Sequence, residues 1–174
     1  MTTETLQATI RTGRISDLAD LAELNHKWFK PNLADIDHGF LSVIYDTNFF
    51  EQIIRSEDLM VFVLDGRMVG YVLVNTVIGT PHIDTVRNEY YESRPENENK
   101  RIAFSYQILV DKELQGTGFF VNAQKEYFNY FKTKYELLVS TVSKENPRSI
   151  AAHQKAGWTF IDTPKHYFII EQLL

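Results

Sequence analysis

The chain has 174 residues and a mass of 20.3 kDa, enough for one domain with a single hydrophobic core and short for two. Apolar residues make up 44% and charged residues 24% of the sequence, which excludes wholesale disorder and low-complexity classes. Lys and Arg number 18 against 23 Asp and Glu, so the net charge is -5 and nucleic acid is not an expected partner. We expect a single domain over residues 1–174.

Cysteine is absent, which excludes disulfides, thiolate metal sites and cysteine nucleophiles. The 5 histidines are scattered without the spacing of metal ligands, so no metal is expected. The N-terminal residues lack a basic segment followed by an apolar one, and the longest apolar run, Leu59–Leu64, is too short to span a membrane. These features predict a cytoplasmic protein with no membrane partner.

The expected order of elements begins with a strand over residues 8–14 and a helix capped by Ser16 or Asp17 that ends at Lys30-Pro31. A second helix begins with Thr47 or Asn48 as its cap. Two apolar runs then flank Asp65-Gly66, which tolerates the positive φ angles of a tight turn, so residues 59–64 and 68–74 predict a β-hairpin.

Residues 80–100 contain two prolines, several acidic residues and little periodicity, and are predicted to form a surface excursion. A strand over residues 102–110, a helix over 119–134 and a strand over 135–142 follow. Asn146, Pro147 and Gly157 delimit a short helix, because they suit its cap, its first turn and its end. Strands over 158–162 and 166–172 close the order β-α-α-β-β-β-α-β-α-β-β.

The segment Gln115-Gly116-Thr117-Gly118 lies between an expected strand and helix and carries the clearest chemical signal. Glycines permit a close approach to the backbone, and the free amides of a helix N-terminus attract an anion such as phosphate. The alternative is a tight turn without a ligand. A dinucleotide fingerprint does not fit, because Val121 stands where a third glycine or alanine is required.

Gln115-x-x-Gly118 resembles the Gln/Arg-x-x-Gly-x-Gly/Ala motif with which the GNAT superfamily of N-acyltransferases binds the CoA pyrophosphate, although Phe120 occupies its last position. A second GNAT signature has Asn, then Ala or Ser three residues on, then Tyr-x-x-x-Gly-Phe. It is similar to Asn146, Ser149, His153 and Gly157-Trp158. The resemblance covers nearly the whole chain. It implies an α+β (mixed α/β) fold, with a mostly antiparallel central sheet of about seven strands, splayed between strands 4 and 5 and flanked by about four helices.

The same resemblance implies acetyl-CoA as co-substrate, held in the gap between strands 4 and 5. The implied contacts are Ile108, Leu109, Val110, Gln115, Gly116, Thr117, Gly118, Phe119, Phe120, Asn146, Ser149 and Lys155. Lys155 is implied to approach the CoA 3′-phosphate. For two of these residues a simpler role is at least as good: Asn146 as a helix cap and Lys155 as a solvated charge.

Catalysis requires a proton for the leaving thiolate, and His153 occupies the position where many GNAT relatives have a tyrosine. A histidine near its ordinary pKa can donate a proton at neutral pH, so His153 is the hypothetical general acid. The base is open, because residues 103–107 hold no carboxylate. Glu98 or Glu96 from the preceding segment, Tyr106 or a water chain are the candidates.

The leading hypothesis is direct transfer of acetyl from acetyl-CoA to a primary amine of a small molecule or protein, in a ternary complex. The acidic residues between 84 and 98 favour a cationic acceptor. A non-catalytic acyl-CoA-binding module is the alternative, favoured by Phe120 and by the missing carboxylate. A third hypothesis is an interaction protein whose apolar residues 167–170 and Leu173-Leu174 pair across a homodimer.

Overall fold

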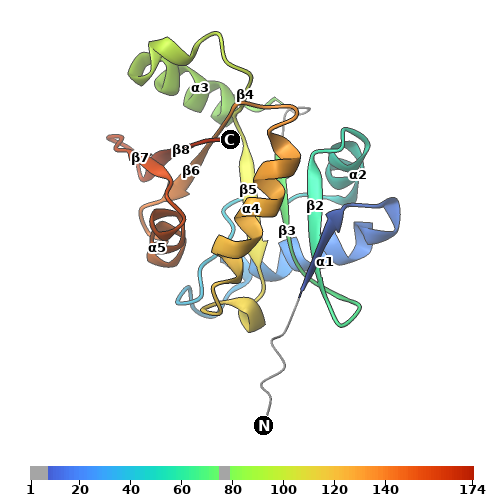
Figure 1. Ribbon diagram of the computed structural model, residues 1–174. Helices are drawn as coiled ribbons and strands as arrows, with labels where there is room; N and C mark the ends of the chain where they lie inside the picture. Colours follow the sequence, from blue (N-terminus) through green and yellow to red (C-terminus); the bar gives the residue numbers. More distant parts are fainter. Residues whose placement is uncertain (1–7, 75–78) are drawn as a thin grey trace.

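The computed structural model describes residues 8–74 and 79–174, and this part of the chain forms five α-helices and eight strands (Figure 1). The helices are α1 (Leu18–Trp28), α2 (Thr47–Arg55), α3 (Pro81–Ser93), α4 (Phe119–Phe131) and α5 (Pro147–Lys155). The strands are β1 (Thr9–Thr12), β2 (Leu59–Leu64), β3 (Arg67–Val74), β4 (Ile102–Ala103), β5 (Tyr106–Val110), β6 (Leu137–Ser143), β7 (Thr159–Ile161) and β8 (Tyr167–Leu173). The expected mixed fold is confirmed, with one helix more than predicted.

The strands form two sheets, ordered β1-β2-β3-β5 and β4-β6-β8-β7. The expected single strand over residues 102–110 is divided at Phe104-Ser105. Before the division β4 pairs in parallel with β6, and after it β5 pairs antiparallel with β3. The two sheets therefore separate between β5 and β6, which confirms the predicted splay between the fourth and fifth strands of the expected order.

Helices cover both faces of the two sheets. Along β2, Met60, Phe62 and Leu64 pack in a cluster with α4, while Leu59 and Val61 pack with α1 and α2. This alternation explains why β2 is apolar throughout, since a strand buried on both faces shows no polar period. A further cluster joins α3 to β6 and β8. The helices thus pack on both sheets, whereas β5 and β6 belong to different sheets and leave a gap between them.

The hairpin of β2 and β3 is confirmed, and Asp65 and Gly66 have φ angles of 51° and 77° at its turn. The predicted cap of α2 is wrong by one residue or two. Asp46 caps this helix, because its carboxylate accepts a hydrogen bond from the Phe49 amide at 2.8 Å.

The predicted surface excursion over residues 80–100 is wrong, because most of it is α3. Thr80 caps the helix by accepting from the Ile83 amide at 3.2 Å, and Pro81 occupies the first turn, where a missing N–H costs nothing. Ile83, Val86 and Tyr90 form its buried face. The acidic residues occupy much of the remainder, which is why the apolar periodicity is weak.

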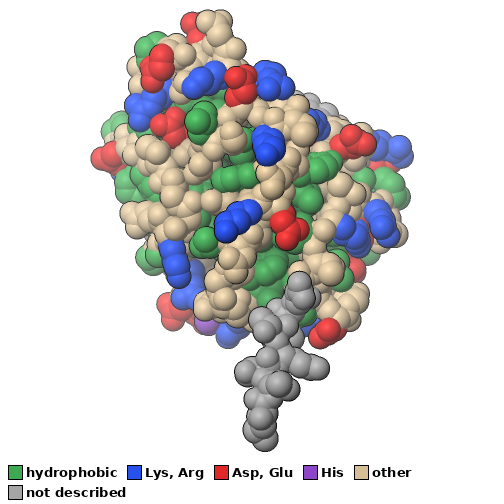
Figure 2. Space-filling model, in the orientation of Figure 1, with side chains coloured by type: hydrophobic (Ala, Val, Ile, Leu, Met, Phe, Trp, Pro, Cys, Tyr) green, Lys and Arg blue, Asp and Glu red, His purple; other side chains and the backbone are tan. Residues whose placement is uncertain are grey.

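The closing strands are confirmed as an antiparallel pair, and β8 lies between β6 and β7. Residues 169–171 are paired on both edges, so the apolar segment considered for a dimer is an inner strand of this sheet. None of the helices in the described part of the chain combines the length and the apolar composition that a membrane crossing requires. Positive and negative side chains are interspersed over the face in Figure 2.

Candidate active site

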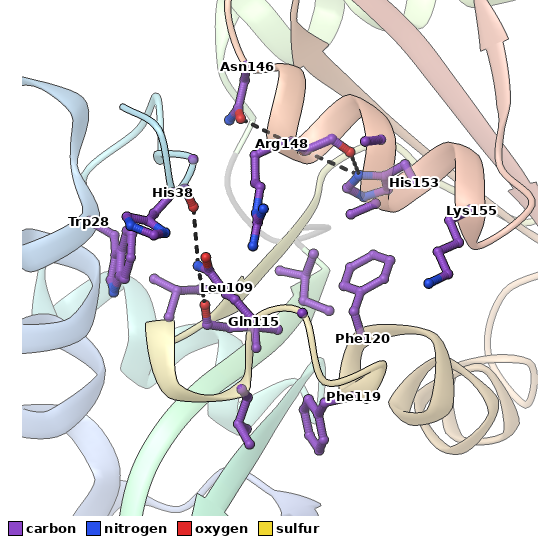
Figure 3. A pocket seen from close by; sticks show the side chains of 18 of the residues that line it. Trp28, His38, Leu109, Gln115, Phe119, Phe120, Asn146, Arg148, His153 and Lys155 are labelled. Carbon is purple, nitrogen blue, oxygen red and sulfur yellow. Dashed lines mark hydrogen bonds between the residues drawn. The ribbon is translucent and has the colours of Figure 1, made fainter. Parts of the chain in front are cut away.

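A pocket of about 320 Å³ lies where β5 separates from β6. The end of β5, the glycine turn, the first turn of α4 and one face of α5 line it, together with residues 38–41 (Figure 3). Every cofactor contact implied by the resemblance lines this pocket except Thr117. The Thr117 hydroxyl instead donates to the Leu114 carbonyl at 2.6 Å and supports the turn.

The glycine turn presents a helix N-terminus to the pocket. Gly116 and Gly118 have φ angles of 76° and 82°, in the left-handed region that favours glycine, and Gly118 is the N-cap residue of α4. Thr117 Oγ1 accepts from the Phe119 amide at 3.3 Å, whereas the amides of Phe120 and Val121 have no acceptor among the described residues. Free amides at the positive end of a helix dipole are a site for an anion.

β5 is an edge strand of its sheet on the side of the gap. The Asp111 amide donates to the Val69 carbonyl at 2.8 Å, and alternate residues of an antiparallel strand bond to the same neighbour. Leu109 therefore directs its amide to β3, while Ile108 and Val110 direct their polar backbone groups to the gap. Gln115 Nε2 donates to the Val110 carbonyl at 3.1 Å from that side, in agreement with this alternation.

Gln115 and Asn146 hold residues 38–41 across the pocket. Gln115 Nε2 also donates to the His38 carbonyl at 3.2 Å, and Asn146 Nδ2 donates to the Phe40 carbonyl at 3.1 Å. Asn146 Oδ1 accepts from the Ser149 amide at 3.1 Å, so its side chain is the helix cap that the simpler reading predicted. Both side chains thus shape the pocket wall from elements far apart in sequence.

Two cationic side chains of α5, Arg148 and Lys155, reach the pocket without a hydrogen-bond or ion-pair partner among the described residues. Figure 3 shows the Arg148 guanidinium between Gln115 and Phe120, and the Lys155 side chain beyond Phe120. Arg148 was not among the predicted residues. The sequence does contain a signal for Arg148. It lies seven residues before Lys155, and this spacing places both side chains on one face of a helix.

His153 is buried, at 5% exposure, and lines the pocket from α5. Its Nδ1–H donates to the Ser149 carbonyl at 2.8 Å, and Nε2 is buried without a hydrogen-bond partner among the described residues. The rings of Phe120 and Trp158 each lie 5.2 Å from the imidazole. Burial lowers the pKa of His153 from 6.5 to about 4, against a smaller opposite effect of the hydrogen bond to Ser149.

The expectation that His153 keeps its ordinary pKa is therefore wrong. At neutral pH the imidazole is uncharged, its proton is on Nδ1, and Nε2 is a free acceptor. A group in this state accepts a proton before it can donate one. Phe120, which replaces the small residue of the GNAT motif, contributes to this burial, because its ring packs against the imidazole in a T-shaped contact (Figure 3).

The low pKa of His153 predicts a pH dependence of stability. Above the unfolded pKa of 6.5 the imidazole is neutral in both states, whereas between pH 6.5 and about 4 only the unfolded chain takes up the proton. Stability is full above that window and falls as pH decreases through it, by about 3 kcal/mol. We expect His153→Phe to show a smaller fall in the free energy of unfolding between neutral pH and pH 4, measured by urea denaturation. An unchanged pH profile would contradict the low pKa.

A second pocket, of about 680 Å³, lies on the far side of the gap. It extends between residues 40–45, β5, β6 and α3. Both pockets share Ile108, Asn146, Ser149 and His153, besides Phe40 and Leu41. His153 is thus one of the few residues that line both pockets.

The side chains considered as a base, Tyr106, Glu98 and Glu96, are not in comparable positions. Tyr106 lines the second pocket, but its hydroxyl is 2.9 Å from the Tyr127 hydroxyl in the core, and burial raises its pKa well above the ordinary value. Glu96 lies within the 3-10 turn Pro95–Asn97 and Glu98 directly after it, and both are exposed and line neither pocket. Among the described residues no cluster of three or more His, Asp or Glu side chains is arranged to hold a metal ion.

The two sheets separate beside a glycine turn and a helix N-terminus, which is the arrangement that the resemblance to GNAT proteins implied. No protein-family model matches the sequence, and no curated protein matches it. Solved structures match at low identity. A GNAT-family acetyltransferase from Listeria monocytogenes has a TM-score of 0.66 at 13% identity and covers 100% of this chain and 99% of its own. The ribosomal-protein-alanine N-acetyltransferase of Brucella melitensis has a TM-score of 0.65 at 15% identity, covering 95% and 99%.

A third structure, the GNAT superfamily phosphinothricin acetyltransferase of Sinorhizobium meliloti in complex with acetyl-CoA, has a TM-score of 0.63 at 16% identity. It covers 96% of this chain and 88% of its own. The resemblance inferred from two short motifs is therefore confirmed at the level of the fold. The chain has the GNAT fold over nearly its full length.

Proposed function

We propose that this protein is an N-acetyltransferase, which transfers acetyl from acetyl-CoA directly to a primary amine while both are bound. One observation carries the proposal: two pockets share His153, whose buried Nε2 has no partner among the described residues, and one of the pockets begins at the glycine turn. An enzyme with two substrates needs such a junction, because the reacting atoms must be held together. The acetyltransferases of the same fold support this choice.

The first pocket suits acetyl-CoA as co-substrate. The free amides of Phe120 and Val121 suit the pyrophosphate, and the Arg148 guanidinium adds a positive charge beside them. The backbone groups of Ile108 on the open edge of β5 suit the amides of the pantetheine arm. When bound, acetyl-CoA supplies an activated carbonyl with a thiol leaving group.

In the mechanism that we propose, His153 moves the proton. Its Nε2 accepts a proton from the attacking amine as the C–N bond forms, and the resulting imidazolium returns that proton to the sulfur as the C–S bond breaks. The Ser149 carbonyl keeps Nδ1–H in place and stabilises the transient positive charge. The Val110 amide is the candidate donor to the oxyanion. The products are the N-acetyl amine and free CoA.

Thermal denaturation with and without acetyl-CoA tests the proposal. A ligand at 100 times its Kd that binds only the native state stabilises it by about 2.7 kcal/mol. In a domain of this size that raises Tm by about 5–10 °C. We expect this rise, together with release of free thiol when an amine is added. The absence of both would contradict the proposed function.

Lys155 and Arg148 give a second prediction with a built-in comparison. If Lys155 contacts the 3′-phosphate, Lys155→Met reduces the preference for CoA over dephospho-CoA about tenfold. Arg148→Met should weaken both ligands alike, because we assign its guanidinium to the pyrophosphate. Calorimetric titration of each protein with both ligands measures the ratio. Equal losses for both ligands in Lys155→Met would remove Lys155 from the 3′-phosphate site.

A non-catalytic acyl-CoA-binding module is the second candidate, and Phe120 favours it because its ring fills part of the pocket beside His153. Thiol release separates the two: a binder shows the rise in Tm without turnover. The location in the cytoplasm and the formation of a homodimer stay predictions of the sequence.

A further inference from the structure

The lining of the second pocket combines apolar and aromatic side chains with hydroxyl, amide and imidazole groups. Among the described residues that line it there is no Asp, Glu, Lys or Arg, and its ionisable members are histidines and tyrosines. Apolar and aromatic side chains from three parts of the chain form much of its wall: Val43, Ile44, Phe49, Ile83, Val86 and Phe104. Hydroxyls such as those of Ser105 and Ser140, and the side-chain amides of Gln107 and Asn146, complete the described lining.

The acidic residues that favoured a cationic acceptor are directed elsewhere. The segment that carries them is largely α3, and none of its carboxylates lines the pocket. Asp84 pairs with Arg87 at 2.9 Å, and Glu89 pairs with Lys165 and accepts from the Tyr167 hydroxyl at 2.9 Å. The support that these residues gave to a polycationic acceptor is therefore lost.

We propose that the acceptor is a monoamine on an alkyl or arylalkyl body, a refinement that rests on the N-acetyltransferase function proposed above. A single amine enters such a pocket as the neutral base, because desolvation lowers the pKa of an ammonium group. The neutral, nucleophilic form of the amine is then populated without a carboxylate base. This agrees with the described lining of the pocket, which contains no carboxylate. A second ammonium group has no carboxylate to pair with and is strongly disfavoured.

Val43 and Ile44 are suitable positions at which to introduce a carboxylate into the pocket. They are 43% and 45% exposed and lie at its edge, so a charge there does not have to be buried in the core. Ile15 is 47% exposed in the short turn before α1 and lines neither pocket, so it is a matched apolar control.

The experiment compares hexylamine with 1,6-diaminohexane, which has the same chain and a second amine, by release of free thiol from acetyl-CoA. Phenethylamine and spermidine extend the comparison. We expect kcat/KM for hexylamine to exceed that for the diamine about 50-fold, since the second ammonium group lacks a partner. Val43→Asp and Ile44→Asp should each reduce this ratio about tenfold by pairing with that group. Ile15→Asp should leave the ratio unchanged, and all three should keep the rise in Tm with acetyl-CoA.

The outcomes separate the two proposals. Turnover with an equal or greater kcat/KM for the diamine or spermidine overturns the monoamine acceptor and leaves the N-acetyltransferase function in place. Unchanged ratios in Val43→Asp and Ile44→Asp also overturn this pocket as the acceptor site. No turnover with any amine overturns the N-acetyltransferase function. In that case calorimetric titration of the CoA-saturated protein measures the Kd of each amine. A Kd for hexylamine that is not lower than that for the diamine overturns the proposal that the pocket binds a monoamine.

Discussion

Gly118→Trp is expected to abolish the rise in Tm that acetyl-CoA produces. Gly118 lines the first pocket as the N-cap residue of α4, and a Cβ at this position would meet no atom within 4 Å. An indole there would extend into the open space beside the free amides of Phe120 and Val121 and exclude the pyrophosphate. Thermal denaturation and calorimetric titration of the variant with acetyl-CoA measure the loss.

A tryptophan at a positive φ angle also strains the backbone, so the stability effect needs its own control. Gly66 provides it, since its φ angle is 77° against 82° at Gly118 and a Cβ there also meets nothing within 4 Å. It belongs to the hairpin of β2 and β3 and lines neither pocket. Gly66→Trp and Gly118→Trp should lower the free energy of unfolding of the free protein comparably, by about 1–2 kcal/mol of backbone strain. Only Gly66→Trp should keep the rise with acetyl-CoA. A rise retained by Gly118→Trp would place the cofactor elsewhere.

The elements that the sequence predicts well are those with local signals. Asp65-Gly66 determines a hairpin turn on its own, and Asn146 with Pro147 determines the start of α5. The helix α3 has a comparable signal in Thr80-Pro81, but its buried face is only Ile83, Val86 and Tyr90. Prolines at residues 81 and 95 suggested a loop, although they lie at the two ends of the helix rather than within it.

The division of the strand over residues 102–110 has no local signal. Phe104-Ser105 contains neither proline nor glycine, and the chain changes partner there because Ile102 pairs with Leu137 while Tyr106 pairs with Val74. Such a change depends on strands far away in sequence. The same reason limits the prediction of the site. The residues of the first pocket could be predicted from one glycine turn and one helix N-terminus in the sequence. The second pocket could not, because its lining comes from segments that only the fold brings together.

His153→Phe tests the proposed movement of the proton. The phenyl ring keeps the packing against Phe120 and Trp158, so acetyl-CoA should bind with a similar Kd. The variant loses Nε2, and we expect kcat to fall about 10²–10⁴-fold, the usual contribution of a general acid or base. His26→Phe is the control, because His26 is exposed on α1 and lines neither pocket.

The pH dependence of kcat distinguishes the two roles open to His153. As a proton acceptor it must be neutral, and with a pKa of about 4 it stays neutral at every pH above that value, so its titration causes no loss of rate at neutral pH. As a resting acid it would have to be protonated, and kcat would fall tenfold for each pH unit above about 4. We expect no such fall in the wild-type protein. A wild-type kcat that decreases steadily from pH 5 to 8 would exclude the acceptor role, and a His153→Phe variant with unchanged kcat would exclude both.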